Sequence, residues 1–326
     1  MKMSPIIPKL FICALLATVG IGVLSLWQQQ SSAAGTSAPP MPEIPAARGV
    51  PPQAAEAAVP LAAAPAASLA EFAPHRARYD MRMVAVSSGA GLSDIRGSMV
   101  YEQDDTCDAW TTDHKFTIEY SYPERPSTVN TTHYVSWEAK DQSQFQFNSE
   151  RSENGAPAEQ LRGSVTRGED GSATAEFVRP QDLYFELPKG YVLPSFHTSE
   201  IIRAAQEGRK TYHAILFDGT DKEGPVEVNA IITRKLTADE VMKSLPADTP
   251  KDGKAMDKKL LSGDAWLVRM AVFPTQDDEN MSPTYEMDLV LHANGAVSHV
   301  LVDYKSFKVE QVLTAIEPIA STKSCP

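Results

Sequence analysis

The sequence predicts a mainly β fold, in which one long antiparallel sheet curls into a partly open barrel with one helix and a short excursion. Ten or more segments after residue 75 have the alternating pattern of strands. Short turns rich in Gly, Pro, Asn and Asp separate these segments. Consecutive strands with short turns form an antiparallel meander, and a sheet of so many strands must curl or close.

The first 34 residues have the layout of a signal peptide. Lys2 and Lys9 form a basic start, residues 10–27 are an uncharged apolar run, and residues 32–34 are small enough for cleavage. The run is also long enough for a retained single-pass anchor. Both alternatives place the following chain in the periplasm, either soluble after cleavage or tethered to the inner membrane through residues 10–27.

Residues 35–70 are expected to be a disordered linker. They contain 13 Ala and 8 Pro, a composition that buries too little apolar surface to fold. The folded domain is therefore expected to span residues 71–326, a length within the range of one all-β domain.

The first strand shows the alternation most clearly. From residue 76, mostly charged side chains alternate with Ala77, Tyr79, Met81, Met83 and Ala85, so that one face is apolar. The same reasoning predicts strands at residues 94–103, 110–122, 131–139, 144–149, 160–167, 172–178, 212–217, 226–234, 265–273, 284–292, 297–305 and 308–317.

One helix is expected after residue 197. Thr198 or Ser199 can cap its start, Ile201 and Ile202 belong to its apolar stripe, and Gly208 ends it. Residues 236–262 are rich in Lys, Asp and Pro and are expected to leave the sheet, with a short helix at 238–244.

A tight hairpin is expected at Asn294-Gly295, because this dipeptide suits a two-residue type I′ turn. That turn sets the register: residue 293 faces 296, 291 faces 298 and 289 faces 300. Leu289, Leu291, Val300, Val302 and Tyr304 then share one inner face.

Charge and motifs exclude several classes of function. The formal net charge of −12 argues against binding nucleic acid or anionic lipid surfaces by bulk attraction. The chain has no H-E-x-x-H, no G-x-S-x-G, no Walker loop and no dinucleotide-binding fingerprint. We therefore expect no enzyme activity, no cofactor and no metal.

Weaker catalytic patterns have ordinary alternatives. Ser195 and His197 are close in sequence, but they precede a helix without a nucleophile elbow. Asp113-His114 is more typical of a solvated strand edge. His292 and His299 are expected on the outer face as diagonal neighbours, and two ligands do not make a catalytic zinc site.

Aromatic residues recur over successive strands. In a curled sheet some would line an apolar groove for an acyl chain or a peptide, and the alternative is an ordinary core. The possible lining residues are Trp110, Phe116, Tyr120, Trp137, Phe145 and Phe147.

Cys107 and Cys325 are the two cysteines of the predicted domain. Two thiols in an exported domain favour one disulfide, and two free thiols are the alternative. Such a bond would clamp the C-terminal end onto the body of the domain.

Several short motifs, in this order, resemble the cell envelope integrity protein B (EipB-like) family over roughly residues 72–326. They are Cys107-Asp108-Ala109-Trp110-Thr111-Thr112, then Leu187-Pro188-Lys189-Gly190, Leu193-Pro194, His197-Thr198, Phe217-Asp218-Gly219-Thr220-Asp221, and a cysteine at the C-terminal end.

The resemblance implies a β-spiral, which is a long antiparallel sheet wound into a partly open barrel beside a helix. It also implies a disulfide between Cys107 and Cys325, and a shape similar to the half-barrels that carry lipoproteins. The implied role is to maintain envelope integrity under stress, without catalysis. The long linker and the excursion at 236–262 depart from the family pattern.

Three hypotheses follow for the function. The first is a non-enzymatic periplasmic factor that binds an envelope protein partner. The second is a lipid or lipoprotein carrier of the half-barrel type, which needs a large apolar concave face. The third and least favoured is a cell-wall or lipid hydrolase, with a nucleophile and base drawn from Ser195, His197 or Asp218.

Overall fold

The computed structural model describes residues 69–245, 256–275 and 282–320. In these ranges the chain forms one fourteen-stranded antiparallel sheet, with the strand order β8-β7-β6-β5-β4-β3-β2-β1-β14-β13-β12-β11-β10-β9. The predicted fold class is confirmed. The predicted signal segment and Cys325 lie outside the described residues.

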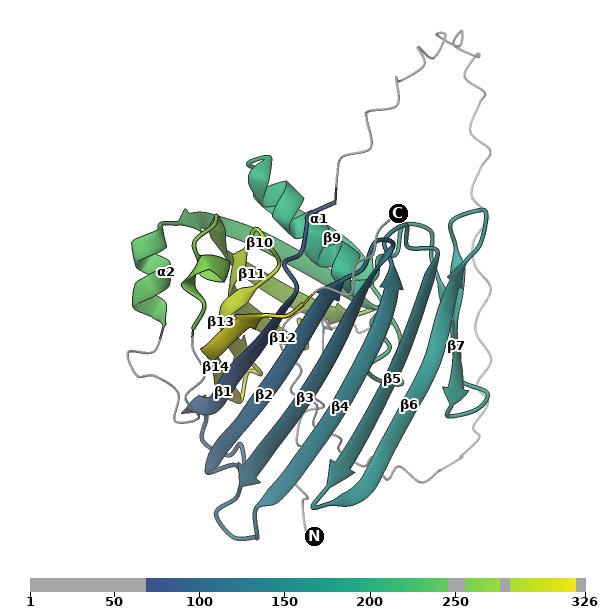
Figure 1. Ribbon diagram of the computed structural model, residues 1–326. Coiled ribbons are helices and arrows are strands. Elements are labelled where there is room, and N and C mark those ends of the chain that lie inside the picture. The colour runs from purple at the N-terminus through teal and green to yellow at the C-terminus, as the bar shows by residue number, and fades with distance from the viewer. Residues whose placement is uncertain (1–68, 246–255, 276–281, 321–326) are drawn as a thin grey trace, which may run out of the picture. The chain divides into compact units, whose positions relative to one another are not determined.

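The strands and helices follow one another with short connections (Figure 1). The first eight strands are β1 (His75–Val86), β2 (Asp94–Asp105), β3 (Ala109–Ser121), β4 (Thr128–Ala139), β5 (Gln144–Glu153), β6 (Ala156–Arg167), β7 (Ala173–Arg179) and β8 (Tyr184–Leu187). The remaining elements are α1 (Pro194–Gln206), β9 (Thr211–Leu216), β10 (Val226–Leu236), α2 (Ala238–Ser244), η1 (Lys258–Leu261), β11 (Ala265–Pro274), β12 (Tyr285–His292), β13 (Val297–Asp303) and β14 (Phe307–Pro318).

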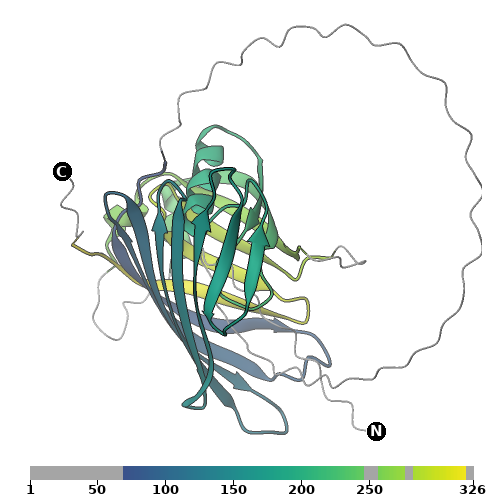
Figure 2. The ribbon, with the colours of Figure 1, turned by 90° about the vertical axis from the view of Figure 1, so that its right-hand side faces the viewer.

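The sheet curls without closing. Strands β1 and β14 pair in the middle of the sheet, and neighbours in the chain extend it on either side to the edge strands β8 and β9. These two edge strands do not pair with each other. Figures 1 and 2 show the strands from β1 to β7 as one broad layer, with β9 to β14 behind it.

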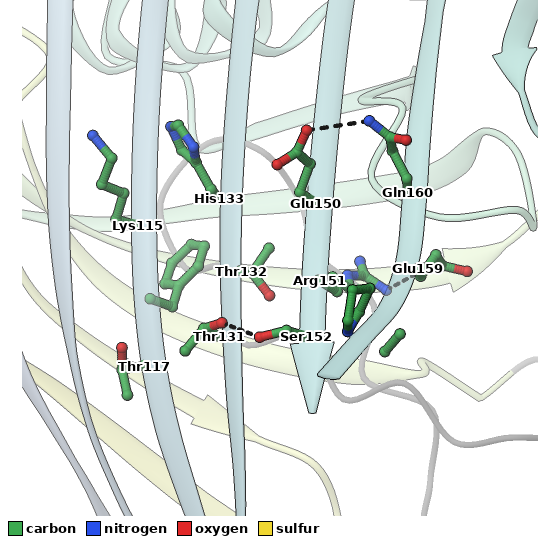
Figure 3. A pocket seen from close by; sticks show the side chains of 13 residues that line it. Lys115, Thr117, Thr131, Thr132, His133, Glu150, Arg151, Ser152, Glu159 and Gln160 are labelled. Atoms are coloured by element: carbon green, nitrogen blue, oxygen red, sulfur yellow. Dashed lines mark hydrogen bonds and ion pairs between the residues drawn. The ribbon is translucent and has the colours of Figure 1, made fainter. Parts of the chain in front are cut away.

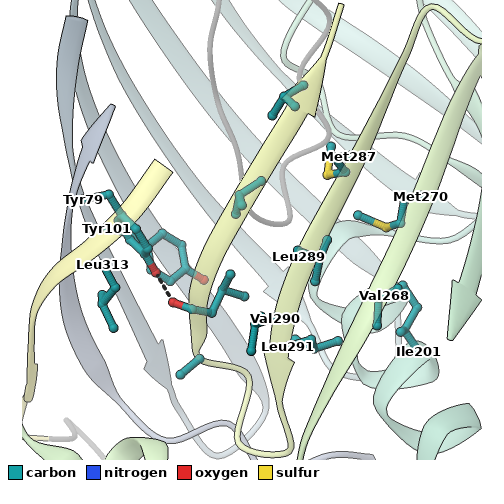
Figure 4. Close-up of a cluster of buried hydrophobic side chains, with 14 of the residues drawn as sticks. Tyr79, Tyr101, Ile201, Val268, Met270, Met287, Leu289, Val290, Leu291 and Leu313 are labelled. Carbon is teal, nitrogen blue, oxygen red and sulfur yellow. Dashed lines mark hydrogen bonds between the residues drawn. The ribbon is translucent and has the colours of Figure 1, made fainter. Parts of the chain in front are cut away.

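The inner face of the sheet carries the core. In β3 every second side chain from His114 to Tyr120 is buried, as the alternation of a half-buried strand requires. Figure 4 shows Met270, Met287 and Leu289 facing the layer that carries Tyr79. The hydroxyl of Tyr79 donates to the carbonyl oxygen of Val297 at 2.7 Å, which joins β1 to β13 inside the core.

The helix was predicted at the right place, but its start was wrong. α1 begins at Pro194, four residues before the predicted cap at Thr198, and its N-cap Leu193 makes no side-chain cap hydrogen bond. Proline is well suited to the first position of a helix because its missing N–H needs no partner there. Gly208 follows the helix with a φ of +75°, as predicted for its end.

The hairpin between β12 and β13 also differs from the prediction. Gly295 N–H donates to the carbonyl of His292 at 3.0 Å, and His292 N–H donates to the carbonyl of Ala296 at 2.9 Å. The turn therefore holds three residues and ends in Gly295 at φ +84°. Leu291 pairs with Val297, so the predicted 291–298 register was wrong, and Ser298 is the bulged residue.

On the far side of this bulge the strand pairing agrees with the predicted register. Leu289 pairs with Val300, as predicted, and all five residues of the predicted inner face are buried. The excursion also contains the predicted short helix, α2, which begins with a capping box between Thr237 and Glu240. Strand β8 was not among the predicted strands. No helix in the described ranges is long and apolar enough to span a membrane.

Candidate functional site

The family-like motif residues gather around the start of α1. Leu187 ends β8 and is buried in one apolar cluster with Tyr191, Leu193 and Phe217. The turn between β8 and α1 includes Gly190 at φ +83°. It is closed by a hydrogen bond of 3.1 Å from Tyr191 N–H to the carbonyl of Pro188.

The segment before α1 bridges part of the gap between the two edge strands. Val192 N–H donates to the carbonyl of Ile215 at 2.8 Å, and Phe217 N–H donates to the carbonyl of Val192 at 3.1 Å. These bonds form a parallel bridge on the free edge of β9. The β8 side of the sheet is therefore tied to β9 through two backbone hydrogen bonds rather than through a strand ladder.

Glu138 of β4 caps α1 from across the interior. Its Oε2 accepts a hydrogen bond from Ser195 N–H at 2.7 Å, and its Oε1 accepts one from Phe196 N–H at 2.8 Å. The first N–H groups of a helix have no partner within the helix and carry partial positive charge, so a carboxylate is a good cap. Burial raises the pKa of Glu138 to about 7, against the opposing effect of these hydrogen bonds.

Ser195 and His197 do not form a nucleophile–base pair among the described contacts. Both side chains are buried, and no hydrogen bond joins them. Neither ring nitrogen of His197 has a hydrogen-bond partner in the described structure, and its ring packs 5.5 Å from that of Tyr212. Burial lowers the pKa of His197 to about 3, so the ring is neutral.

The loop after β9 ties the two layers together. The hydroxyl of Tyr134 donates to the carbonyl oxygen of Asp218 at 2.8 Å, and Arg151 Nη2 donates to the carbonyl of Thr220 at 2.5 Å. Thr220 Oγ1 donates in turn to Asp218 Oδ1 at 2.7 Å. Burial and the neighbouring Asp218 raise the pKa of Asp221 to about 7.

A second anchor of this loop is a small ion-pair network. Glu159 of β6 lies 2.9 Å from Arg151 Nη1 and 2.6 Å from Lys222 Nζ. The roles of Arg151 and Glu138 could not be predicted from the sequence, because their partners lie 69 and 57 residues away in the chain. No local pattern marks such contacts.

The six aromatic residues proposed as a groove lining fall into two groups. Trp110, Phe116, Tyr120, Phe145 and Phe147 are buried on the inner face. Several of them pack on other rings, such as Phe147 on Phe177 at 5.0 Å and Trp110 on Phe72 at 5.3 Å. Trp137 does not join them, since it is only half-buried and alternates with the inward-facing Glu138.

The remaining histidine candidates are separated. Asp113 lies 3.1 Å from His133 Nε2 on the outer face, whereas its neighbour His114 is buried on the inner face. His292 was predicted on the outer face beside His299. It is buried, with Nε2 3.0 Å from Oγ of Ser298, the bulged residue of β13. The described residues contain no cluster of three or more metal-ligating side chains.

An open groove of about 720 Å³ crosses β3 to β6 (Figure 3). Two rows of outward-facing side chains border it, because residues paired across neighbouring strands lie side by side. One row is Lys115, His133, Glu150 and Gln160, and the other is Thr117, Thr131 and Ser152. Phe116 is the one member of the predicted aromatic set among its lining residues.

Hydrogen bonds fix several of these polar side chains. Gln160 Nε2 donates to Glu150 Oε1 at 3.1 Å, and the hydroxyls of Thr131 and Ser152 lie 2.5 Å apart. The groove thus offers hydroxyl, amide, carboxylate and ammonium groups on a rigid sheet surface. This composition suits a polar partner rather than an acyl chain.

Comparison with known proteins agrees with this architecture. The cell envelope integrity protein EipB of Brucella abortus (strain 2308) is 27% identical over 256 residues, which are 78% of this chain and 87% of that protein. A solved β-barrel-like protein of a domain of unknown function from Brucella abortus shares the fold, with a TM-score of 0.67 and 24% identity over 78% of this chain and 100% of that one. The EipB-like family model matches residues 66–320, and the chain belongs to this family.

Proposed function

We propose that the protein maintains cell envelope integrity as a non-enzymatic periplasmic factor that binds an envelope protein partner. Membership of a family named for envelope integrity supports the role. The observation that carries the binding mode is the open polar groove across β3 to β6, which offers a peptide segment hydroxyl, amide and charged side chains. The candidate nucleophile Ser195 is, by contrast, buried at the start of α1.

Replacement of Thr131 by Arg tests this proposal. Thr131 is exposed in the middle of the groove, and an Arg side chain would fill the groove without entering the core. In cells that lack the native protein, we expect this variant to fail to restore tolerance to a membrane-perturbing detergent. A photo-crosslinking residue at Thr131 should give a discrete protein adduct in cells.

Ile231 of β10 supplies a matched control. Its side chain is 48% exposed, and it is not among the residues that line the groove. Ile231→Arg should restore detergent tolerance, and both variants should unfold at the same urea concentration as the parent. Full rescue by Thr131→Arg, with no adduct at Thr131, would overturn the groove as the partner-binding surface.

A lipid or lipoprotein carrier is the second candidate. Its lipid-binding face would have to come from the aromatic inner face, where Trp110, Tyr120 and Phe145 are already buried. Native mass spectrometry of the protein purified from the periplasm separates the two functions. A mass excess equal to a phospholipid or an acylated peptide would favour the carrier, and a bare mass would favour the protein-binding factor.

A disulfide clamp belongs to the same proposal. A bond between Cys107, which lies two residues after the end of β2, and Cys325 would hold the end of the chain beside the first strands of the sheet. The clamp would keep the curled sheet together during partner binding, in a compartment where such bonds persist.

A further inference from the structure

Two titratable groups are fully buried where α1 meets the sheet, and neither has a partner of opposite charge among the described residues. Glu138 is 1% exposed and His197 is 0% exposed. Glu138 faces the first turn of α1 from β4, and His197 belongs to α1 itself. Undocking of the helix would expose both groups to water together.

The hydrogen-bond partners of Glu138 are neutral, and an ion pair between Lys140 and Asp105 lies beyond Trp110 on the same face. Two backbone N–H groups of α1 occupy its oxygens, and no described Lys, Arg or His forms an ion pair with it. The titratable groups that sense its charge are the phenols of Tyr101 and Tyr134, whose own pKa values are raised by burial. Burial of a carboxylate without a cation favours its protonated form, and its pKa is about 7.

His197 is also buried without a partner of opposite charge, but burial has the opposite effect on its protonation. Neither ring nitrogen has a hydrogen-bond partner in the described structure, and the ring packs against that of Tyr212 in β9. Burial without an acceptor favours the neutral imidazole, and its pKa is about 3. An exposed histidine, in contrast, would be protonated below about pH 6.5.

We propose that Glu138 and His197 are a compensating pair that keeps α1 docked on the sheet in mild acid, because docking takes up a proton at one group and releases one at the other. In the docked state, below about pH 7, Glu138 is protonated and His197 is neutral. In the undocked state, between about pH 4.5 and pH 6.5, Glu138 is ionised and His197 is protonated.

The two effects of pH on docking are opposite in sign. Acidification in this window strengthens docking through Glu138, because the docked state binds the extra proton there. Acidification weakens docking through His197, because there the undocked state binds the extra proton. Each effect alone would change the docking equilibrium by roughly tenfold per pH unit, and together they cancel.

Hydrogen exchange of the α1 amides measures the docking equilibrium directly. Protection factors are measured for the purified protein and its variants between pH 5.0 and pH 6.5, with a correction for intrinsic exchange rates. The quantity compared is the ratio of the variant's protection factor to that of the parent. For Glu138→Gln the ratio should fall by roughly tenfold per pH unit on acidification. For His197→Phe it should rise by a similar factor, and for the double variant it should stay flat.

Glu207→Gln is the control, since Glu207 lies at the end of α1, is exposed and pairs with Arg203 and Arg209. Its ratio should not depend on pH in this window. If one variant fails to fold, the other carries the test alone, because each slope has its own sign. A flat ratio for a folded Glu138→Gln or His197→Phe variant would overturn the proposal.

Discussion

Tyr134 of β4 donates its hydroxyl hydrogen to the carbonyl oxygen of Asp218, 84 residues further along the chain, at a distance of 2.8 Å. Both residues are buried. We expect Tyr134→Phe to lower the free energy of unfolding by about 1–2 kcal/mol, because it leaves a buried carbonyl without its donor. Urea denaturation measures this loss.

Tyr184→Phe is the control for that measurement. Tyr184 is 63% exposed, and its hydroxyl makes no described hydrogen bond, so its removal should leave the unfolding midpoint unchanged. Equal midpoints for the two variants would show that the bond to Asp218 contributes nothing to stability.

Gly219 sits against the ring of Phe147. Its φ is +67°, and a Cβ added there would lie 2.5 Å from Phe147 Cγ. Phe147 is held by Phe177 and Phe217, so it has little room to move. Gly219→Ala should therefore cost about 1–3 kcal/mol for the clash, in addition to about 1 kcal/mol for the left-handed backbone.

Gly155 separates these two contributions. Its φ is +81°, but nothing lies within 4 Å of an added Cβ. Gly155→Ala should show the backbone cost alone in thermal or urea unfolding. The prediction for Gly219 is wrong if both alanine variants lose the same stability.

His292 should make the protein less stable in acid. Burial, with a smaller effect from His75, lowers its pKa to about 4 from 6.5. The unfolded chain then binds more protons than the folded one between pH 6.5 and pH 4. The stability that the neutral ring contributes above pH 6.5 is therefore lost as the pH falls through this window.

His292→Gln tests this dependence, since glutamine keeps a polar atom for Ser298 but does not titrate. The parent should lose up to about 1.4 kcal/mol per pH unit relative to the variant below pH 6.5. Urea midpoints at pH 7.5, 6.0 and 5.0 give the comparison. A constant difference between the two proteins would contradict the expected titration.

The local sequence predicted most strands, but it did not predict features that depend on contacts with distant residues. The alternation at Ala77 to Ala85 identifies β1, because each inner position meets the same core. The start of α1 could not be predicted in this way, since its cap is a carboxylate from another strand rather than Thr198 or Ser199. A helix capped from 57 residues away carries no capping signal of its own.

The same limit applies to the proposed binding surface. The lining predicted from the sequence consists of six large aromatic side chains, and five of them are buried in the interior. The groove instead lies among ordinary polar residues such as Thr131 and Gln160. Their alignment depends on the register of four strands, which no single strand encodes.

The end of β14 lies close enough to Cys107 for a disulfide with Cys325. Pro318 pairs with His75, and His75 pairs with Gln103, four residues before Cys107. Two strand spacings are about 10 Å, whereas seven extended residues after Pro318 reach about 23 Å. We expect the oxidised protein to be two mass units lighter than the reduced one. Cys107→Ser should lower the unfolding temperature under oxidising conditions, and the loss of stability should be at most about 5 kcal/mol. An unchanged unfolding temperature would exclude the clamp.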